Sequence, residues 1–486
     1  MFFTMVVSLY TSRVVLEVLG VEDFGIYNII GGVVVLFTFL TNALTNSTQR
    51  YLNYNVGLND IISTKKVFCV SMQAHFVISV IVLLLAETLG LWLVNNKLNI
   101  PHERMYATCW VYQLSVLVTI INIMRIPYNA VVIAYEKMSF FAYVTILETV
   151  LKLLIVYALF INDTFDKLIL YSILLNVTAL IIWYVYRGYC RKYYEVSKYT
   201  NVKSYDLFKE LISFTTWYLY GGLAMVASRQ GINIILNIFF NVMVNAAVGV
   251  ANQVKSAVYG FVSSFQTAFN PQIVKLYANK DFDALSILII RSSKFSFYLM
   301  LFLSLPIIFC CEDILSIWLV DVPKYAVTFT QLTIITTLFD AVSAPLWTLI
   351  GATGNIKRYQ IIVSCIIFID IPLSYILLKS GLEPYYVFIS NIIVNMIAYI
   401  FRYIYTRKQI NLSLKNYSLK VFFPCLIITL FSILSSYVLT MAFPNMWIIT
   451  FIFTALSILI FVYIGGLDNQ ERKYLIRVLF KRVHEK

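Results

Sequence analysis

The sequence has little charge and very little histidine. Charged residues make up 13% of the 486 positions, and histidines number 3. A soluble domain of this length needs far more charge to cover its surface. The 7 cysteines form no CxxC pair, and neither an HExxH motif nor a glycine-rich phosphate loop occurs. We therefore exclude a soluble globular protein and expect no disulfide framework, metal site or cofactor.

Apolar residues dominate instead. Hydrophobic residues make up 60% of the chain, and the mean hydropathy is +0.81. Runs of about 20 apolar residues recur from end to end, and each is long enough to cross a hydrocarbon layer of about 30 Å. We expect an all-α integral membrane protein with about fourteen transmembrane helices. Residues 1–19 lack the basic stretch and cleavage site of a signal peptide, so we interpret them as the first span.

The positions of the basic residues predict the orientation. Of the 37 Lys and Arg residues, 27 fall in one set of alternate connections and 5 in the other. By the positive-inside rule both termini lie in the cytoplasm. The net charge of +13 therefore does not indicate a nucleic-acid partner. The outward connections, such as 20–25, 95–104 and 162–167, are short. A membrane polysaccharide polymerase or glycosyltransferase needs a larger outward loop, so we do not expect an enzyme.

The longest inward connection divides the chain into two parts. The predicted organisation is a six-helix lobe over 1–190, a cytoplasmic linker over 191–209, a second six-helix lobe over 210–408, two additional transmembrane helices over 409–465 and a basic cytoplasmic tail over 466–486.

Two spans in corresponding positions of the lobes carry a polar face. In 25–49 and 245–275, polar residues and glycine recur at intervals of three and four. The span before the second of these places Arg229, Asn233 and Asn237 at a spacing of four. Such a stripe is costly against lipid, so it faces protein or water. Close helix packing is the alternative for the Ser and Gly positions. We infer a pseudo-twofold repeat around a water-filled cleft, as in alternating-access transporters.

Four stretches of sequence carry a family resemblance: SLYTSRVVLEVLGVEDFGIYNIIGGVV, STQRYL, RIPYNAVVIAYEKMS, and AVGVANQV leading to FNPQIVKLY. They resemble the lipid-linked oligosaccharide (O-antigen or polysaccharide) flippases of the multidrug/oligosaccharidyl-lipid/polysaccharide exporter superfamily. The resemblance covers the first twelve spans. It implies two lobes around a central cavity and a polyprenyl-diphosphate-linked sugar unit as substrate, moved to the periplasmic leaflet of a bacterial inner membrane. A polysaccharide polymerase or glycosyltransferases are possible partners, and we expect a monomer.

The candidate substrate-binding residues combine cations with amides. Cationic side chains can hold a diphosphate, and amides can bond sugar hydroxyls. The candidates are Arg13, Asn42, Arg50, Arg229, Asn233, Asn237, Asn252, Gln253 and Lys255. Alternatives remain open: Glu17 can neutralise Arg13, and Arg50 can serve as an interface anchor. Glu148 and Lys152, spaced by four, favour a structural ion pair.

Two carboxylates complete the candidate set. Asp340 and Asp370 lie near the middle of spans ten and eleven, where each can bind a proton or sodium ion and couple its gradient to transport. The alternative is that they pair with a base such as Arg229. A multidrug or sodium/proton-coupled exporter of the same fold is the competing function. Such a pump favours acids and aromatic residues in its cleft over Arg13, Arg229 and Lys255.

Overall fold

The structure is a computed structural model. It describes residues 7, 10, 11, 14, 15, 17–20, 23, 26, 27, 30, 38–96, 101–161, 165–240, 242–319, 321–410, 413–444 and 446–473. Within these residues it contains helices and no strand, which confirms the all-α prediction.

In the described part of the chain, 11 helices are long and apolar enough to cross a membrane. Two further long helices, α2 (Thr38–Gly57) and α9 (Val242–Ala278), are not among them. These are the helices whose polar faces the sequence singled out, and the polar residues lower their hydropathy. The predicted first span, 1–19, lies largely outside the described residues. The 11 apolar helices, together with α2 and α9, correspond to the predicted spans from 25–49 to 446–465.

The chain divides into two compact units. Unit 1 comprises Met1–Leu223 with Val274–Lys280, and unit 2 comprises Ala224–Ile273 with Asp281–Lys486. Two helices, α8 (Tyr205–Phe240) and α9, therefore contribute to both units. The predicted limits of the lobes, linker and tail stay a prediction.

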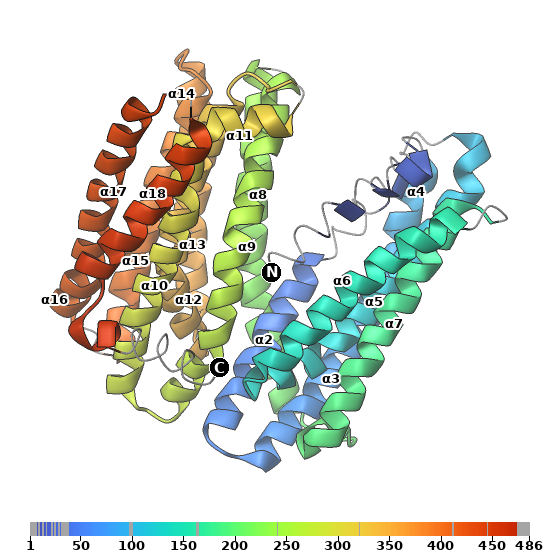
Figure 1. Ribbon diagram of the computed structural model, residues 1–486. Coiled ribbons are helices and arrows are strands. Elements are labelled where there is room, and N and C mark those ends of the chain that lie inside the picture. Colours follow the sequence, from blue (N-terminus) through green and yellow to red (C-terminus); the bar gives the residue numbers. More distant parts are fainter. Residues whose placement is uncertain are drawn as a thin grey trace, which may run out of the picture. The chain divides into compact units, whose positions relative to one another are not determined.

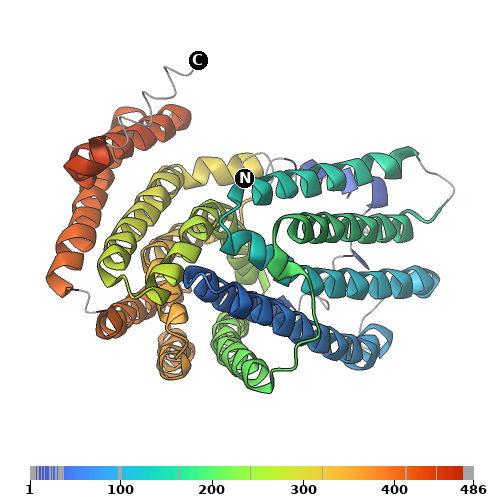
Figure 2. The same ribbon diagram turned by 90° about the horizontal axis from the view of Figure 1, so that it is seen from below.

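Unit 1 is built around one central helix. Helix α5 contacts α2, α3 and α7, and Figures 1 and 2 show α3, α5, α6 and α7 running side by side. The helices that complete the unit are α3 (Ile61–Leu85), α4 (Leu91–Asn96), α5 (Met105–Ala134), α6 (Met138–Ile161) and α7 (Lys167–Tyr193).

A π turn joins α3 to α4 over Ala86–Gly90. Such a turn widens the helix and disturbs its regular hydrogen bonds. The hydroxyl of Tyr112 on α5 donates a hydrogen bond to the carbonyl of Ala86 at 2.7 Å. A Cβ atom at Gly90 would overlap this hydroxyl, so glycine is what lets Tyr112 reach the turn.

The predicted outward connections of unit 1 meet at one end. Arg104, at the start of α5, binds Asp23 at 2.5 Å and Asp166 at 2.6 Å. Asp166 also caps α7 by accepting from the backbone N–H groups of Leu168 and Ile169. Burial alone would raise the pKa of Asp166, but the Arg104 hydrogen bond and the two N–H groups outweigh it and lower the pKa.

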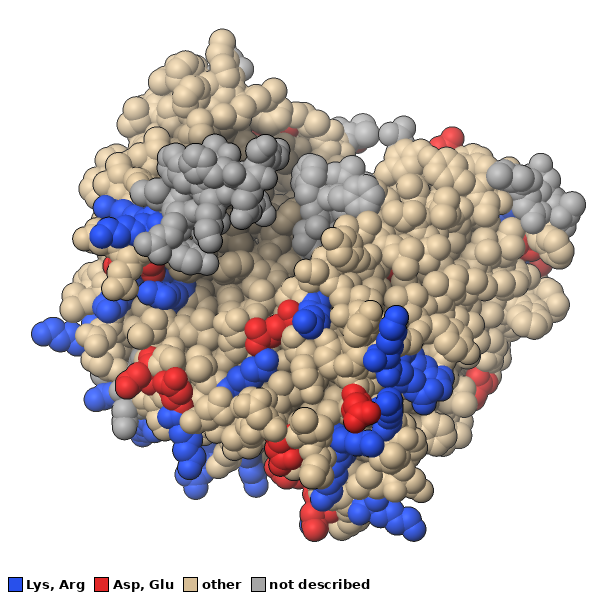
Figure 3. Space-filling model, turned by 60° about the horizontal axis from the view of Figure 1, so that its bottom comes forward, with Lys and Arg blue, Asp and Glu red and all other residues tan. Residues whose placement is uncertain are grey.

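Three predicted inward connections meet at the opposite end of α5. Lys275, near the end of α9, binds Glu136 in the turn after α5 at 2.6 Å. The Cα of Lys275 lies so close to Gly57, the last residue of α2, that a Cβ there would approach it to 2.7 Å. The predicted alternation of outward and inward connections is thus found within unit 1, with the two sets at opposite ends of α5. Figure 3 shows Lys and Arg side chains gathered on the face brought forward in that view.

Unit 2 centres on α12, which packs against α10 and α15. Besides parts of α8 and α9, its helices are α10 (Phe282–Phe309), α11 (Cys311–Trp318), α12 (Ala326–Ala352), α13 (Lys357–Phe368), α14 (Asp370–Lys379), α15 (Tyr385–Ile410), α16 (Leu414–Tyr417), α17 (Phe423–Ala442) and α18 (Trp447–Phe461).

A proline within α12 removes a backbone donor, and a polar side chain from α9 compensates. Pro345 in α12 has no N–H to offer the carbonyl four residues earlier. That carbonyl, of Ala341, instead accepts from Gln266 of α9 at 3.2 Å. At the break between α13 and α14, Ser228 of α8 donates to the carbonyl of Ile367 at 3.4 Å, and Pro372 follows in the first turn of α14. The break leaves Asp370 as the first residue of α14.

The segment after α18 packs back on α10. Lys294 binds Glu471 at 2.6 Å, and both side chains are buried. Lys294 lies within α10, and its side chain reaches this carboxylate of the segment after α18. A Cβ at Gly466 would approach Ile428 to 2.8 Å and the ring of Tyr298 to 2.9 Å, so glycine permits the close contact.

Candidate functional site

A polar cavity of about 370 Å³ lies inside unit 2. Its charged lining residues are Arg229, Lys255, Arg402, Asp340 and Asp370. Four amides, Asn233, Asn252, Asn391 and Asn395, also line it. The cavity therefore offers three cations, two carboxylates and several neutral hydrogen-bonding groups.

Helical spacing explains why these residues meet. The lining residues of α9 are Val248, Asn252, Lys255, Ser256 and Tyr259, and those of α12 are Thr333, Thr336, Asp340, Ser343 and Trp347. Intervals of three and four place each set on one face of its helix. Each helix thus turns one polar face toward the same space.

The cations of the cavity differ in how they are held. Lys255 Nζ lies 3.8 Å from Asp340 Oδ2. Arg402 is buried, donates from Nε to Tyr359 Oη at 2.9 Å and from Nη1 to Ser343 Oγ at 3.0 Å. The ring of Trp347 lies 5.8 Å from the guanidinium carbon of Arg402. Arg402 is therefore fixed by neutral groups, whereas Lys255 has a carboxylate nearby.

Asp370 is fully buried and bound by neutral donors. Ser390 Oγ donates to Oδ1 at 2.8 Å, and Asn391 Nδ2 donates to Oδ2 at 2.7 Å. Asn395 in turn donates to Asn391 Oδ1 at 3.2 Å. Among the described residues, no Lys or Arg forms an ion pair with Asp370. Its pairing with Arg229, one alternative left open by the sequence, is not formed here.

The structure brings six predicted residues together in this cavity: Arg229, Asn233, Asn252, Lys255, Asp340 and Asp370. Asn237 and Gln253 lie on the same helices but are exposed and are not among the lining residues. The binding and coupling roles of all of them stay predictions.

Two predicted residues belong to unit 1, and one lies outside the described residues. Asn42 is exposed on α2. Arg50 stacks on aromatic rings, with its guanidinium carbon 4.3 Å from the ring centre of Tyr51 and 5.4 Å from that of Phe214. Arg13 is the residue that the structure does not describe.

Arg402, Asn391 and Asn395 line the cavity but were not among the predicted site residues. Helix α15 continues to Ile410 and buries the side chain of Arg402. The signal was present: positions 391, 395 and 402 are spaced by four and seven, so they lie on one helical face.

An ion-pair cluster on α5 and α6 belongs to unit 1. Lys152 binds Glu148 at 2.8 Å, which confirms the structural pair predicted from their spacing. Arg125 of α5 binds the same carboxylate at 3.2 Å. This second ion pair of Glu148 was not predicted.

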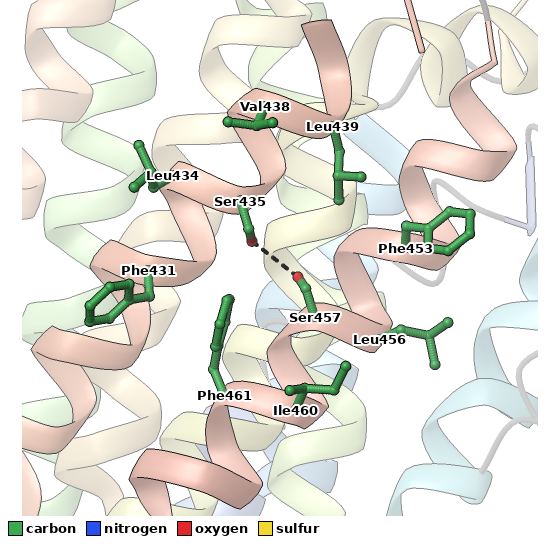
Figure 4. A pocket seen from close by; sticks show the side chains of 10 residues that line it. All are labelled: Phe431, Leu434, Ser435, Val438, Leu439, Phe453, Leu456, Ser457, Ile460 and Phe461. Carbon is green, nitrogen blue, oxygen red and sulfur yellow. Dashed lines mark hydrogen bonds between the residues drawn. The ribbon is translucent and has the colours of Figure 1, made fainter. Parts of the chain in front are cut away.

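A second pocket in unit 2 is apolar (Figure 4). It lies between α17 and α18 and is lined by side chains such as Phe431, Leu434 and Phe453. Its two polar residues, Ser435 and Ser457, lie 3.1 Å apart and satisfy each other. This pocket suits hydrocarbon and offers nothing to a charged group.

The comparisons with known proteins bear on the fold. Residues 222–376 match the model of the MatE family. The chain resembles the crystal structure of a MATE mutant, with a TM-score of 0.73 at 13% identity over 85% of this chain and 94% of that one. The chain has the fold of MATE transporters, a family of transporters rather than enzymes.

Two further structures show the same likeness. One is an outward-facing multidrug resistance MATE family transporter of the MOP superfamily, with a TM-score of 0.71 at 15% identity over 84% of this chain and 92% of that one. The other is a MOP superfamily transporter from Pyrococcus furiosus, whose binding pocket of reverse polarity is said to suggest a different function. Its TM-score is 0.68 at 14% identity, over 84% and 92% of the two chains. No curated protein matches the chain.

Proposed function

We propose that the protein is a flippase. It moves a polyprenyl-diphosphate-linked oligosaccharide, such as an O-antigen, capsule or exopolysaccharide repeat unit, from the cytoplasmic to the periplasmic leaflet by alternating access. The observation that carries the proposal is the cavity of unit 2, in which Arg229, Lys255 and Arg402 outnumber the two carboxylates.

The chemistry of the cargo requires such a cavity. A diphosphate cannot enter hydrocarbon without losing its hydration, so the protein must replace the lost water. Arginine and lysine bind phosphate oxygens through charge-assisted hydrogen bonds. The amides beside them suit sugar hydroxyls, and the apolar pocket between α17 and α18 offers a surface for the polyprenyl chain.

The proposed setting is a bacterial inner membrane with both termini in the cytoplasm. Predicted outward connections meet at Arg104, and predicted inward connections meet at Lys275. This grouping supports the alternation of outward and inward connections from which the orientation was derived. The excess of basic residues on the second set then assigns that end to the cytoplasm.

A multidrug exporter coupled to protons or sodium is the second candidate. The comparisons favour it over the flippase, because one matched structure is named as a multidrug resistance MATE family transporter. The buried carboxylate of Asp370 and the aromatic rings of Trp347 and Phe388 in the cavity also suit a cationic drug. The fold accepts pockets of different polarity, as the transporter from Pyrococcus furiosus is reported to show.

The test is the distribution of the lipid-linked precursor between the two leaflets of cells that depend on this protein. Arg229→Ala and Lys255→Ala each remove one cation from the cavity, and we expect each to slow translocation about tenfold or more, because a charge-assisted contact contributes about 1.5–3 kcal/mol. Lys152→Gln is the matched control, since it removes a cation from a membrane helix outside the cavity.

The outcomes separate the two candidates. Loss of surface polysaccharide on deletion, with precursor retained on the cytoplasmic leaflet, supports the flippase. Drug hypersensitivity with intact polysaccharide supports the exporter and overturns the flippase. Normal translocation by both cavity variants shows that the site assignment is wrong.

A further inference from the structure

Arg402 is a buried cation with hydrogen-bond donors to spare. It lines the cavity with 7% of its surface exposed. Of the five N–H donors of its guanidinium, one points to Tyr359 and one to Ser343. Both partners are neutral, so they orient the group without cancelling its charge. Arg402 is therefore a preorganised binding group for an oxyanion, and neither the sequence analysis nor the comparisons assign it that role.

Asp340 balances the cations without being fixed to them. Its Oδ2 lies 3.8 Å from Lys255 Nζ, which is too long for a hydrogen bond. In the part of the chain that the structure describes, its carboxylate accepts no hydrogen bond from any side chain or backbone N–H. Its electrostatic field also acts on Arg402 and on Tyr259. The carboxylate thus lies close enough to neutralise the cations, and no hydrogen bond from the described residues holds it in place.

The other carboxylate of the cavity differs in each respect. Asp370 is fully buried and accepts two short hydrogen bonds, from Ser390 and Asn391. The side chain of Asp340 keeps 30% of its surface exposed. The two aspartates therefore have different tasks, and Asp340 is the one placed to move.

We propose that Asp340 is an internal counter-ion, which neutralises an oxyanion site formed by Lys255 and Arg402 and gives way to a phosphate group of the cargo. The proposal rests on the anionic cargo of the proposed function. Cations in a medium of low dielectric constant are costly without a nearby anion, so Asp340 stabilises the empty cavity. A phosphate bound by these two cations carries the same sign of charge as Asp340, so the two anions repel each other. They therefore compete for Lys255 and Arg402. The competition weakens cargo binding and so eases its release.

The test measures binding to the full chain, purified in detergent, by titration calorimetry. Two probes are used: farnesyl diphosphate, which carries a short prenyl chain, and inorganic pyrophosphate. We expect Asp340→Asn to bind the probe about tenfold more tightly than the unaltered protein, and Lys255→Gln about tenfold more weakly. Asp340→Ser, a smaller replacement, serves if the first variant does not fold. Glu87→Gln, which neutralises an acid in unit 1, is the control and should leave binding unchanged.

Each outcome bears on the proposal. Tighter binding of both probes by the Asp340 variants means that the site recognises the diphosphate itself. Tighter binding of farnesyl diphosphate alone means that the site recognises the lipid-linked form. Either result supports the role of Asp340 as a counter-ion. Unchanged or weaker binding by the Asp340 variants overturns the counter-ion while leaving the anionic cargo in place. If no protein binds either probe, both the inference and the proposed anionic cargo fail.

Discussion

Replacing Lys294 by methionine tests what holds the C-terminal segment to α10. At 2.6 Å the attraction between Lys294 and Glu471 amounts to about 6 kcal/mol at an effective dielectric constant of about 20. Much of this is offset by the desolvation of two buried ions. Breaking a buried pair nevertheless costs about 3–5 kcal/mol, because one charge remains uncompensated. Arg291 stays 3.7 Å from Glu471, so we expect the lower end, about 3 kcal/mol.

The double variant gives the comparison that isolates the pair. Lys294→Met with Glu471→Leu leaves no buried charge, and we expect its stability to lie within about 1 kcal/mol of the unaltered protein. The two single variants should each be less stable than the double variant. Additive losses, with the double variant the least stable of the three, would refute the reasoning, because they would mean that the two charges do not interact.

Thermal unfolding can be followed with a thiol-reactive dye. Cys69, Cys190, Cys310, Cys311 and Cys425 are buried, so they react only when the fold opens. Cys365 is exposed and would label the folded protein, and a Cys365→Ser background removes that signal.

Three further predictions concern single contacts. Gly57→Ala should destabilise unit 1 by about 1–3 kcal/mol, because its methyl group meets the backbone of Lys275; a thermal midpoint equal to that of the unaltered protein would contradict this. Gly466→Ala should lower the midpoint similarly, since its methyl group approaches an aromatic ring to 2.9 Å. Arg104 lowers the pKa of Asp166 in the folded protein. The Asp166 carboxylate therefore contributes its full stabilisation above its ordinary pKa of 3.8, and this stabilisation is lost as the pH falls through the lower folded-state pKa. Asp166→Asn should remove this acid-dependent loss, and a midpoint that still falls equally between about pH 5 and about pH 3 would argue against it.

Much of the architecture was predictable because membrane insertion leaves a strong mark on sequence. Long apolar runs predict the helices, and the alternation of basic connections predicts which turns share a side, as Asp23, Arg104 and Asp166 do in unit 1. These signals are local or periodic, so they can be recognised in the sequence without knowledge of the fold.

The candidate site was predicted less completely, because burial depends on how far each helix extends. Arg402 and Lys294 lie near the ends of apolar runs, where a basic residue usually marks a connection. The structure buries both, each beside a partner far away in the sequence: Tyr359 for Arg402 and Glu471 for Lys294. Hydropathy cannot report such pairings, since they depend on which helices become neighbours.

The crossing of α8 and α9 between the units has a consequence for biosynthesis. The segment Val274–Lys280 completes unit 1, yet the ribosome makes it only after all of Ala224–Ile273, which belongs to unit 2. The amino-terminal half therefore cannot finish folding while the nascent chain is shorter than this.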